Sequence, residues 1–316
     1  MANPERGNQT VLTEFILVGF GNHPELQTLL FLLFLLIYIA TMAGNILIFA
    51  LVMADQHLHT PMYFFLGNLS CLEICYTSTI LPRVLAGLLS VDKTISFSLC
   101  LTQYYFFGSL VVTECLLLSA MSYDRYLAIC NPLHYAARMS GRACLQLAGG
   151  SWIGGFLCCG IATLSISQLT FYGPNVIDHF FCDFIPLVKL SCNDPHLMET
   201  LAVTLMLLFS LVPFLLTFIS YICIIASILR IPSTTGRQKT FSTCSSHLIV
   251  VSIYYATLLI VYMFPTTDIL NDLKKNLSIV YTVLTPLVNP LIYSLRNKEI
   301  QEALRKACGK FMLGLR

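Results

Sequence analysis

Four charged residues stand out because each interrupts an apolar stretch of the sequence. Glu73 and Glu114 break runs that are otherwise long enough to cross a membrane, and Asp124-Arg125 lies within MSYDRYLAIC. A charged side chain inside a bilayer costs about 2.5–3.5 kcal/mol even on insertion scales, so it usually faces a bundle interior or a polar cavity. The two glutamates are therefore expected to point inward. Asp124-Arg125 fits either an interfacial anchor or an ion pair that changes partners between two states.

Composition decides the broad class of the protein. Of 316 residues, 56% are hydrophobic and only 11% are charged, and the mean hydropathy is +0.76. These values lie outside the range of ordinary soluble chains and indicate one integral membrane domain. The net charge of +2 is slight and the aromatic residues follow the apolar runs, which disfavours nucleic acid as a partner.

Seven stretches are long enough to cross about 30 Å of hydrocarbon as helices. They predict an all-α seven-transmembrane bundle over residues 26–296, preceded by a segment 1–25 and followed by a tail 297–316. The expected spans are Leu26–Ala54, Gln56–Pro82, Thr94–Tyr123, Ala143–Ile177, Thr200–Leu229, Thr240–Thr267 and Asn276–Leu295.

The distribution of lysine and arginine predicts the orientation, because basic loops stay cytoplasmic. With the N-terminus outside, twelve of the 18 basic residues fall on the inner side and six on the outer side. This favours an extracellular N-terminus and a cytoplasmic C-terminus, with the first span acting as signal anchor. Asn8 then begins an external Asn-Gln-Thr sequon, which makes it a glycosylation site.

Three cysteines are expected on the outer side, where disulfides form. Cys100 lies near the outer end of the third span, and Cys182 and Cys192 lie in the loop before the fifth. A bridge from Cys100 would tether this loop over the bundle and contribute about 4 kcal/mol in the entropy model. The residues alone leave both Cys182 and Cys192 open as the partner.

Four long motifs carry a family resemblance that covers nearly the whole chain. They are PMYFFLGNLSCLE (Pro61–Glu73), MSYDRYLAICNPLHY (Met121–Tyr135), RQKTFSTCSSHL (Arg237–Leu248) and PLVNPLIYSLRN (Pro286–Asn297). In this order and at these spans, they resemble the signature stretches of the olfactory receptors, which are rhodopsin-like G-protein-coupled receptors. The resemblance implies an odorant receptor of the plasma membrane. It also implies coupling to a stimulatory, olfactory-type G protein and a rise in cyclic AMP.

The same resemblance assigns roles to single residues. It pairs Cys100 with Cys182, and it makes Asp124, Arg125 and Tyr126 the activation motif, with Tyr221 as a later partner of Arg125. Asn289, Pro290 and Tyr293 match the switch of the last helix, where the proline permits a hinge. Asn45, Glu73 and Glu114 match polar positions halfway through the bundle. Glu73 and Glu114 would be neighbours, forming either a shared sodium or proton site or a structural polar cluster.

The resemblance also places a ligand pocket among the outer halves of the third, fifth, sixth and seventh spans. Its mostly apolar residues suit a small volatile molecule with one or two hydrogen-bonding groups. Phe107 stands where amine receptors have an acid, so a cationic amine is disfavoured. The expected pocket residues are Phe107, Gly108, Val111, Val112, Leu205, Met206, Phe209, Tyr255, Leu258, Leu259, Tyr262, Ile279 and Thr282.

Residues after Leu295 predict an amphipathic helix on the inner leaflet, with its bases drawn to anionic lipid. Cys308 within it is either a palmitoylation site or an ordinary thiol. The G-protein surface is expected at the inner ends of the third, fifth, sixth and seventh spans. Nearby residues are His134, Tyr135, Arg230, Arg237 and Lys239.

Three other functions fit the sequence less well than a receptor does. Nucleophile-elbow and HExxH motifs are absent, and His57 with His59 is better explained as a solvated loop pair than as metal ligands, so an enzyme is not expected. The last span has no lysine for a retinal Schiff base. A secondary transporter would use Glu73 and Glu114 as an ion site, but such folds show paired repeats and interrupted helices, and neither is evident.

Two positions depart from the family pattern. Phe171-Tyr172-Gly173 stands where many members carry a further cysteine, so Cys192 is expected to lack a mate. Ala256 replaces a common glycine beside Tyr255, and its effect on activation does not follow from the sequence.

Overall fold

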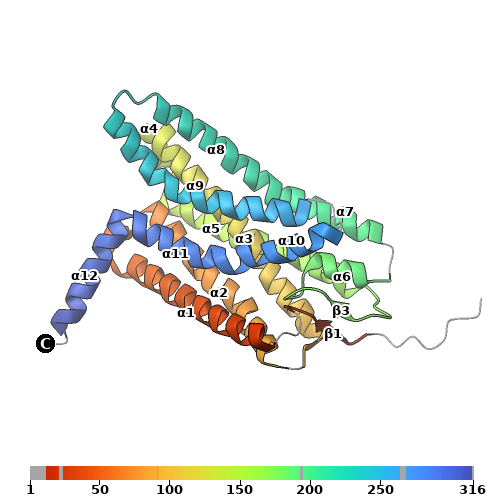
Figure 1. Ribbon diagram of the computed structural model, residues 1–316. Coiled ribbons are helices and arrows are strands. Elements are labelled where there is room, and N and C mark those ends of the chain that lie inside the picture. Colours follow the sequence, from red (N-terminus) through yellow and green to blue (C-terminus); the bar gives the residue numbers. More distant parts are fainter. Residues whose placement is uncertain (1–11, 21–23, 91, 193–194, 264–267, 315–316) are drawn as a thin grey trace, which may run out of the picture.

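The computed structural model describes residues 12–20, 24–90, 92–192, 195–263 and 268–314, and within them seven helical segments run alongside one another as a bundle (Figure 1). Five segments are single helices: α1 (Pro24–Ala54), α2 (Pro61–Leu89), α3 (Phe97–Cys130), α5 (Gly141–Ser167) and α9 (Thr234–Met263). The other two are each continued through a π-helical turn. They are α7 (Pro195–Met206) with α8 (Val212–Leu229), joined by Leu207–Leu211, and α10 (Asp268–Ile279) with α11 (Thr285–Arg296), joined by Val280–Leu284.

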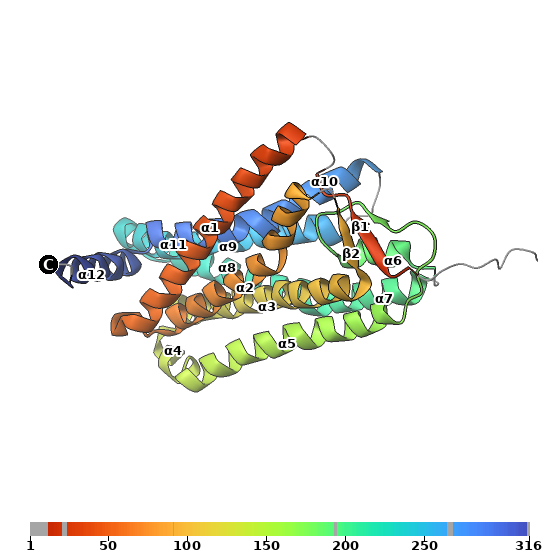
Figure 2. The ribbon, with the colours of Figure 1, turned by 90° about the horizontal axis from the view of Figure 1, so that it is seen from below.

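Short elements mark the two ends of the bundle (Figures 1 and 2). The strands β1 (Glu14–Leu17), β2 (Thr94–Ser96) and β3 (Val176–Ile177) and the helix α6 (Phe184–Leu190) lie at the end called here the sheet end. The helices α4 (Pro132–Arg138) and α12 (Lys298–Gly314) lie at the opposite end, called the α12 end. In the sheet, β1 is central, antiparallel to β2 and parallel to β3.

Six of the seven segments are long and apolar enough to cross a membrane. The remaining segment, α9, contains only the shorter apolar stretch His247–Tyr262, because its first half is rich in Ser, Thr, Lys and Arg. Its 30 residues make a helix of about 45 Å at 1.5 Å per residue. The polar half of α9 therefore extends toward the α12 end, beyond the apolar stretch.

Several expected span boundaries were wrong. The second helix begins at Pro61, after a short 3-10 turn that Asp55 caps, and it continues through Pro82 to Leu89. The third helix continues past Tyr123 to Cys130, and Pro132 then starts α4, because a residue before proline disfavours the helical conformation.

Two further boundaries differ from those expected. The fourth helix stops at Ser167, and the apolar residues up to Ile177 form the following loop and β3. The last segment begins at Asp268 instead of Asn276. Apolar composition alone cannot separate a span from a buried loop, which explains the error in the fourth helix.

The helices differ in how much of their surface faces the interior. In the most apolar window of α3, 67% of the residues are buried, against 22% for α1. Leu29 and Leu32 of α1 and Leu157 of α5 have more than half of their surface exposed, as suits contact with lipid. The bundle is thus arranged around α3, whose side chains meet most of the other helices.

Gly155 sets the close approach of α5 to α3. A Cβ atom at this position would lie 3.0 Å from the backbone nitrogen of Thr113, and closer still to the Thr113 hydroxyl and the Ser109 carbonyl. Backbone atoms cannot move aside without shifting the helix. Any side chain at residue 155 would therefore force the two helices apart.

We expect Gly155→Ala to lower the free energy of unfolding by about 1–3 kcal/mol, the usual range for overpacking. Gly149→Ala and Gly150→Ala are matched controls in the same helix, because a Cβ at either position meets nothing within 4 Å. Thermal unfolding of the purified protein in detergent measures the effect. Equal midpoints for the 155 and 149 variants would show that this contact does not limit helix packing.

Candidate functional site

An apolar cavity lies between α3, α5, α7, α9 and the loop that leads into α6. Its interior volume is about 140 Å³, and about 970 Å³ when its open mouth is included. Its walls are mainly aliphatic and aromatic, and Asp183 is the one carboxylate among the described residues that line it. The lining residues are Tyr104, Phe107, Gly108, Val111, Val112, Cys158, Cys159, Ala162, Asp183, Phe184, Leu205, Met206, Ser210, Leu211, Tyr255, Leu258, Leu259 and Tyr262.

Ten of the thirteen expected pocket residues line this cavity, and three do not: Phe209, Ile279 and Thr282. Phe209 lies in the π-helical turn Leu207–Leu211, where the wider turn changes which side chains face inward, and Ser210 and Leu211 line the cavity instead. The Thr282 hydroxyl is used within its own helix, where it donates to the Ser278 carbonyl at 2.5 Å.

Asp183 is the cavity residue that sequence reasoning missed. The side chain is buried and caps α6, because its Oδ1 accepts from the Phe184 N–H at 2.8 Å. The Tyr262 hydroxyl donates to its Oδ1 and Oδ2 at 3.2 and 3.1 Å and lies 3.1 Å from the Tyr281 hydroxyl. Burial raises the pKa of Asp183 to about 6, while the bonds from Phe184 and Tyr262 act in the opposite direction. The sequence feature that could have identified Asp183 is its position as an acidic residue directly after Cys182, which forms the disulfide.

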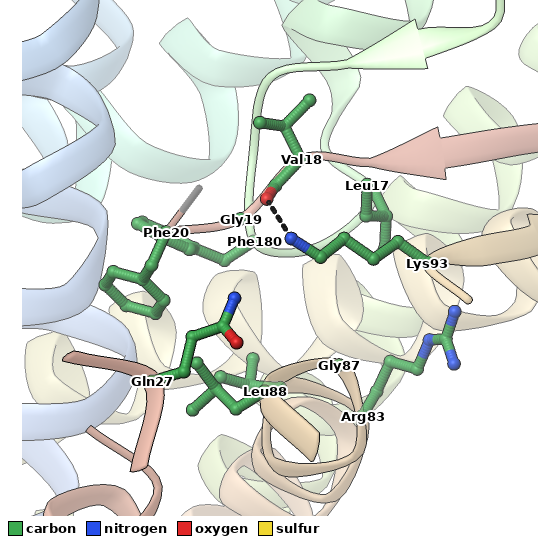
Figure 3. Close-up of a pocket in the computed structure, with 11 residues that line it drawn as sticks. Leu17, Val18, Gly19, Phe20, Gln27, Arg83, Gly87, Leu88, Lys93 and Phe180 are labelled. Carbon is green, nitrogen blue, oxygen red and sulfur yellow. Dashed lines mark hydrogen bonds between the residues drawn. The ribbon is translucent and has the colours of Figure 1, made fainter. Parts of the chain in front are cut away.

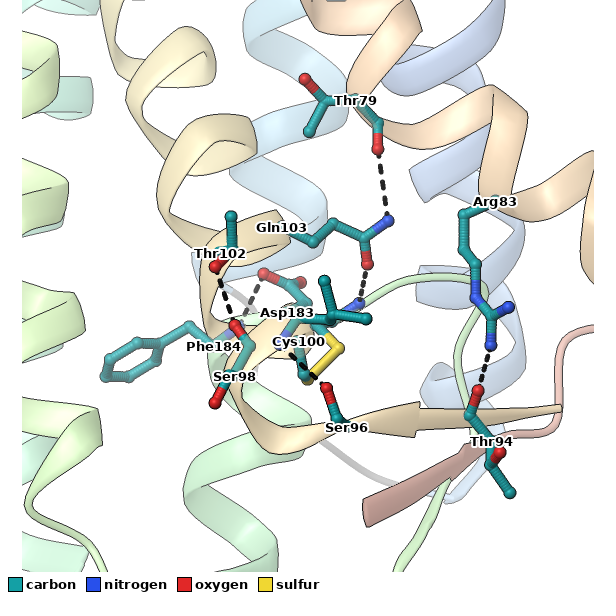
Figure 4. The surroundings of a disulfide bond; sticks show 12 residues. Thr79, Arg83, Thr94, Ser96, Ser98, Cys100, Thr102, Gln103, Asp183 and Phe184 are labelled. Atoms are coloured by element: carbon teal, nitrogen blue, oxygen red, sulfur yellow. Dashed lines mark hydrogen bonds between the residues drawn. A yellow bond between two sulfur atoms is a disulfide. The ribbon is translucent and has the colours of Figure 1, made fainter. Parts of the chain in front are cut away.

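The disulfide from Cys100 to Cys182 holds this loop in place (Figure 4). The predicted pairing is confirmed in the structure, and Cys192 is free and exposed as expected. Gln103, one turn further along α3, adds two hydrogen bonds: its Oε1 accepts from the Cys182 N–H at 3.1 Å and its Nε2 donates to the Thr79 carbonyl at 3.3 Å. Asp183 is therefore fixed above the cavity by covalent and polar contacts on its N-terminal side.

Asp183 also lines a second, outer cavity. This one has an interior of about 280 Å³ and lies between the β3–α6 loop, α6 and α10, with Lys189, Lys274, Lys275 and Asp178 among its polar groups. Lys275 forms an ion pair with Asp178 at 2.5 Å. Because Asp183 lines both cavities, it stands at the boundary between the outer cavity and the inner one.

Halfway along the bundle, α2 and α3 each carry one buried carboxylate, Glu73 and Glu114. The Asn289 side-chain amide donates to Glu73 Oε1, and Asn45 donates to the carbonyls of Thr41 and Pro286 at 3.1 and 3.2 Å. Glu73 Oε2 and both oxygens of Glu114 have no hydrogen-bond partner among the described residues. Buried polar atoms without partners are rare and costly.

At the α12 end, Arg125 forms an ion pair with Asp124, which also accepts a hydrogen bond from the Tyr135 hydroxyl at 2.7 Å. The Tyr221 hydroxyl is 2.5 Å from Nδ1 of His247 and so links α8 to α9. Tyr221 is therefore engaged with His247 and not with Arg125. Sequence reasoning missed His247, although it lies within the motif at Arg237–Leu248.

The remaining predicted site residues lie around these contacts. Tyr126 packs against the buried cluster of Tyr221, Ile224, Ile228 and Cys244, and the buried Tyr293 hydroxyl has no partner in the described part of the chain. Pro290 lies inside α11 and faces α1, where a Cβ at Gly44 would be 3.1 Å from it. Asn8 lies outside the described residues. Cys308 is in α12, but its side chain is not among those described.

Comparison with known proteins gives a single answer. The family model described as "Olfactory receptor" matches residues 34–310. The chain belongs to the olfactory receptor family. It is 50% identical over 299 residues to human olfactory receptor 10A7, with 95% of both chains covered. It is 46% identical over 306 residues to mouse olfactory receptor 5AP2, with 97% of this chain and 96% of the relative covered.

The fold agrees with that family. The crystal structure of squid rhodopsin superposes with a TM-score of 0.67 at 15% identity, covering 92% of this chain and 87% of that one. The likeness confirms the predicted seven-helix receptor bundle. The olfactory receptors are multi-pass membrane G-protein-coupled receptors and not enzymes, so the expected class is confirmed as well.

The raised pKa of Asp183 predicts a pH-dependent difference in stability. Because the folded pKa of about 6 lies above the ordinary 3.8, folding favours the protonated form, and this contribution is lost as pH rises from about 4 through 6. We expect Asp183→Asn to match the native receptor near pH 4 and to be more stable at pH 7, by about 2–3 kcal/mol.

Thermal unfolding of both proteins from pH 4 to 7 measures this difference. His179 also titrates near there, since burial lowers its pKa to about 4, but it is present in both proteins and cancels in the comparison. If the difference in stability between the native receptor and Asp183→Asn were constant from pH 4 to 7, Asp183 would not titrate in that range.

Proposed function

We propose that this olfactory receptor binds small, mostly apolar ligands with a hydrogen-bond donor and activates a stimulatory, olfactory-type G protein, raising cyclic AMP. The observation that carries the ligand class is Asp183 with Tyr262 at one end of an otherwise apolar cavity. Apolar walls provide affinity, and few polar groups fix orientation. An amine was disfavoured because Phe107 stands in α3 where amine receptors have an acid. Asp183, in the loop before α6, places a carboxylate in the cavity, so amines are included in the proposed ligand class.

The coupling route runs through two tyrosines of α9. The Tyr255 hydroxyl donates to the Cys115 carbonyl and the Tyr254 hydroxyl to the Val111 carbonyl, both at 2.8 Å, so both tie α9 to α3. Tyr255 also lines the cavity. A ligand that displaces Tyr255 would remove one of these ties and allow α9 to move outward from α3.

The α12 end would respond to that movement. Displacing α9 separates His247 from Tyr221, which is then free to accept Arg125 from Asp124. An open groove between the ends of α3, α8 and α9 suits a partner helix of a G protein. The structure, with Asp124–Arg125 and Tyr221–His247 both formed, corresponds to the resting state in this scheme.

The scheme requires the sheet end to be extracellular and the α12 end cytoplasmic, at the plasma membrane. Two features support this orientation: the excess of basic residues expected on the inner side and a disulfide at the sheet end, since disulfides form in oxidising compartments. Sodium or a proton between Glu73 and Glu114 would hold α2, α3 and α11 together in the resting state.

A cyclic-AMP reporter in cells tests the function, using alcohols and amines against hydrocarbons and esters of the same shape. We expect the agonists to be alcohols or amines, which carry a hydrogen-bond donor. Arg125→Ala should give no response at equal surface expression. Asp183→Asn should lower the potency of donor ligands about tenfold, since a hydrogen bond to a charged group contributes about 1.5–3 kcal/mol.

Cys192→Ser is the matched control, because this thiol is free and lines neither cavity. Agonism confined to ligands without donors would contradict the ligand class. Solute uptake that survives Arg125→Ala, with no cyclic-AMP signal, would instead favour a transporter.

The ion site is tested by replacing sodium with choline at constant chloride. Sodium bound between the resting helices should reduce agonist potency about fivefold, within the usual range of allosteric coupling. Glu73→Gln and Glu114→Gln should abolish this dependence, whereas Glu302→Gln, at an exposed position of α12, should keep it. Sodium dependence that survives both interior substitutions would exclude these carboxylates as the site.

A further inference from the structure

A groove between α8 and α9 opens on the outside of the bundle near its α12 end. The two helices run side by side to that end, where residues 230–233 join them (Figure 1). The interior of the groove is about 310 Å³, more than twice that of the ligand cavity. The lining residues are Ile225, Ile228 and Leu229 of α8 and Thr234, Arg237, Gln238 and Phe241 of α9.

The walls of the groove are mainly apolar and face outward. Ile225, Leu229 and Phe241 have 41%, 64% and 52% of their surface exposed. The apolar span Val203–Leu229 ends at the groove, which places the groove at the level where hydrocarbon gives way to lipid headgroups. Because apolar surface is favourably removed from water, these walls suit acyl chains.

Arg237 is the one charged residue among the described residues that line the groove. Its Nε is buried and has no hydrogen-bond partner in the described part of the chain. The sequences of α8 and α9 contain no aspartate or glutamate, so neither wall offers a carboxylate. A buried N–H without a partner is costly, and guanidinium N–H groups match the geometry of phosphate oxygens.

Two cations at the sheet end differ from Arg237 in this respect. In the small pocket between the end of β1 and α2, Lys93 donates to the Val18 carbonyl at 3.4 Å (Figure 3). Arg83 beside it donates to the Thr94 carbonyl (Figure 4). Backbone oxygens therefore serve both of these side chains, whereas the buried nitrogen of Arg237 has no such acceptor among the described residues.

The first turn of α9 adds to the preference for an anion. Ser233 caps this turn, because its hydroxyl accepts from the Gly236 N–H at 3.2 Å and its carbonyl accepts from the Arg237 N–H at 2.9 Å. Arg237 thus lies at the N-terminal end of a 30-residue helix, where the helix dipole favours negative charge. Positive charge and apolar surface therefore adjoin in one groove.

We propose that this groove binds one anionic phospholipid of the inner leaflet, with its phosphate on Arg237 and an acyl chain along Phe241 and the apolar residues of α8. Such a lipid supplies an anion for the guanidinium and hydrocarbon for the walls. A free anion would leave the walls uncovered, and a neutral lipid would bring no net charge to Arg237. The inner-leaflet placement rests on the orientation given under the proposed function.

A lipid in the groove would contact α8 and α9 together. The hydrogen bond between Tyr221 and His247 joins the same two helices, and both side chains are buried. Lipid binding stabilises this arrangement of the helix ends, because a ligand favours the conformation that it binds. The position of α9, which changes in the proposed coupling to a G protein, would then depend on the surrounding lipid as well.

Thermal unfolding of the purified full-length receptor in nanodiscs tests the site without odorant or G protein, so failure of the signalling proposal would not affect its outcome. Nanodiscs of phosphatidylcholine are compared with nanodiscs of phosphatidylglycerol that carry the same acyl chains. We expect the midpoint to be about 2–4 °C higher in phosphatidylglycerol, as for a ligand well above its dissociation constant. Each variant is compared with itself in the two lipids, so a change in its intrinsic stability cancels.

Arg237→Gln should abolish the rise, because it removes the guanidinium. Arg230→Gln is the matched control and should keep the rise, since it removes the same charge at an exposed position nearby that does not line the groove. Ile225→Trp should abolish the rise without changing the charge, because the larger side chain fills the groove. This variant is the decisive one if Arg237→Gln fails to fold.

Three outcomes would contradict the lipid site. An equal rise in the native receptor, Arg237→Gln and Arg230→Gln would show general attraction between the membrane and a basic surface. A rise caused by inorganic phosphate in phosphatidylcholine nanodiscs, lost in Arg237→Gln but kept in Ile225→Trp, would identify a free anion as the occupant. The absence of any rise in phosphatidylglycerol would exclude an anionic lipid.

Discussion

Polar side chains inside this bundle bond within their own helix or to a neighbouring helix, because lipid supplies no partners. Asn289 donates to Glu73 across α11 and α2, Asn45 to the Pro286 carbonyl, and the α9 tyrosines to carbonyls of α3. Each bond fixes the relative position of two helices more specifically than apolar contacts do. The relative placement of the helices in this structure therefore depends in part on a small number of cross-helix hydrogen bonds.

The same constraint underlies the proposed effect of a small ligand at the distant α12 end. Tyr255 lines the cavity and also donates a hydrogen bond from α9 to the Cys115 carbonyl of α3. A ligand that displaced the Tyr255 side chain would have to break this hydrogen bond. At the α12 end, Tyr221 and His247 form the corresponding tie between α9 and α8. Hydrogen bonds thus hold α9 at two levels: two from Tyr254 and Tyr255 to α3, and one between His247 and Tyr221 of α8.

Burial also separates the roles of three carboxyl groups. Asp124 is neutralised by Arg125 and by the Tyr135 hydroxyl. Asp183 is buried in a loop with two hydrogen-bond donors, and its pKa rises to about 6. Glu114 has no donor among the described residues. Similar chemical groups therefore differ in role according to what surrounds them: Asp124 is an ion-pair partner, and we propose Asp183 as a ligand contact and Glu114 as part of an ion site.

Apolar runs determined the membrane class and the bundle, because they are local properties of the chain. The bridge from Cys100 to Cys182 and most of the apolar cavity wall followed only from the resemblance of the motifs to the olfactory receptors. The helix boundaries, the position of Asp183, the pairing of Tyr221 with His247 and the exclusion of Phe209 from the cavity depended on tertiary structure. A loop folded back by a disulfide and a π-helical turn both change which side chains meet, and neither leaves a periodic signal. Polar partners far apart in sequence are chosen only when the helices assemble, since each group bonds to whatever the packing of α3 and its neighbours brings within reach.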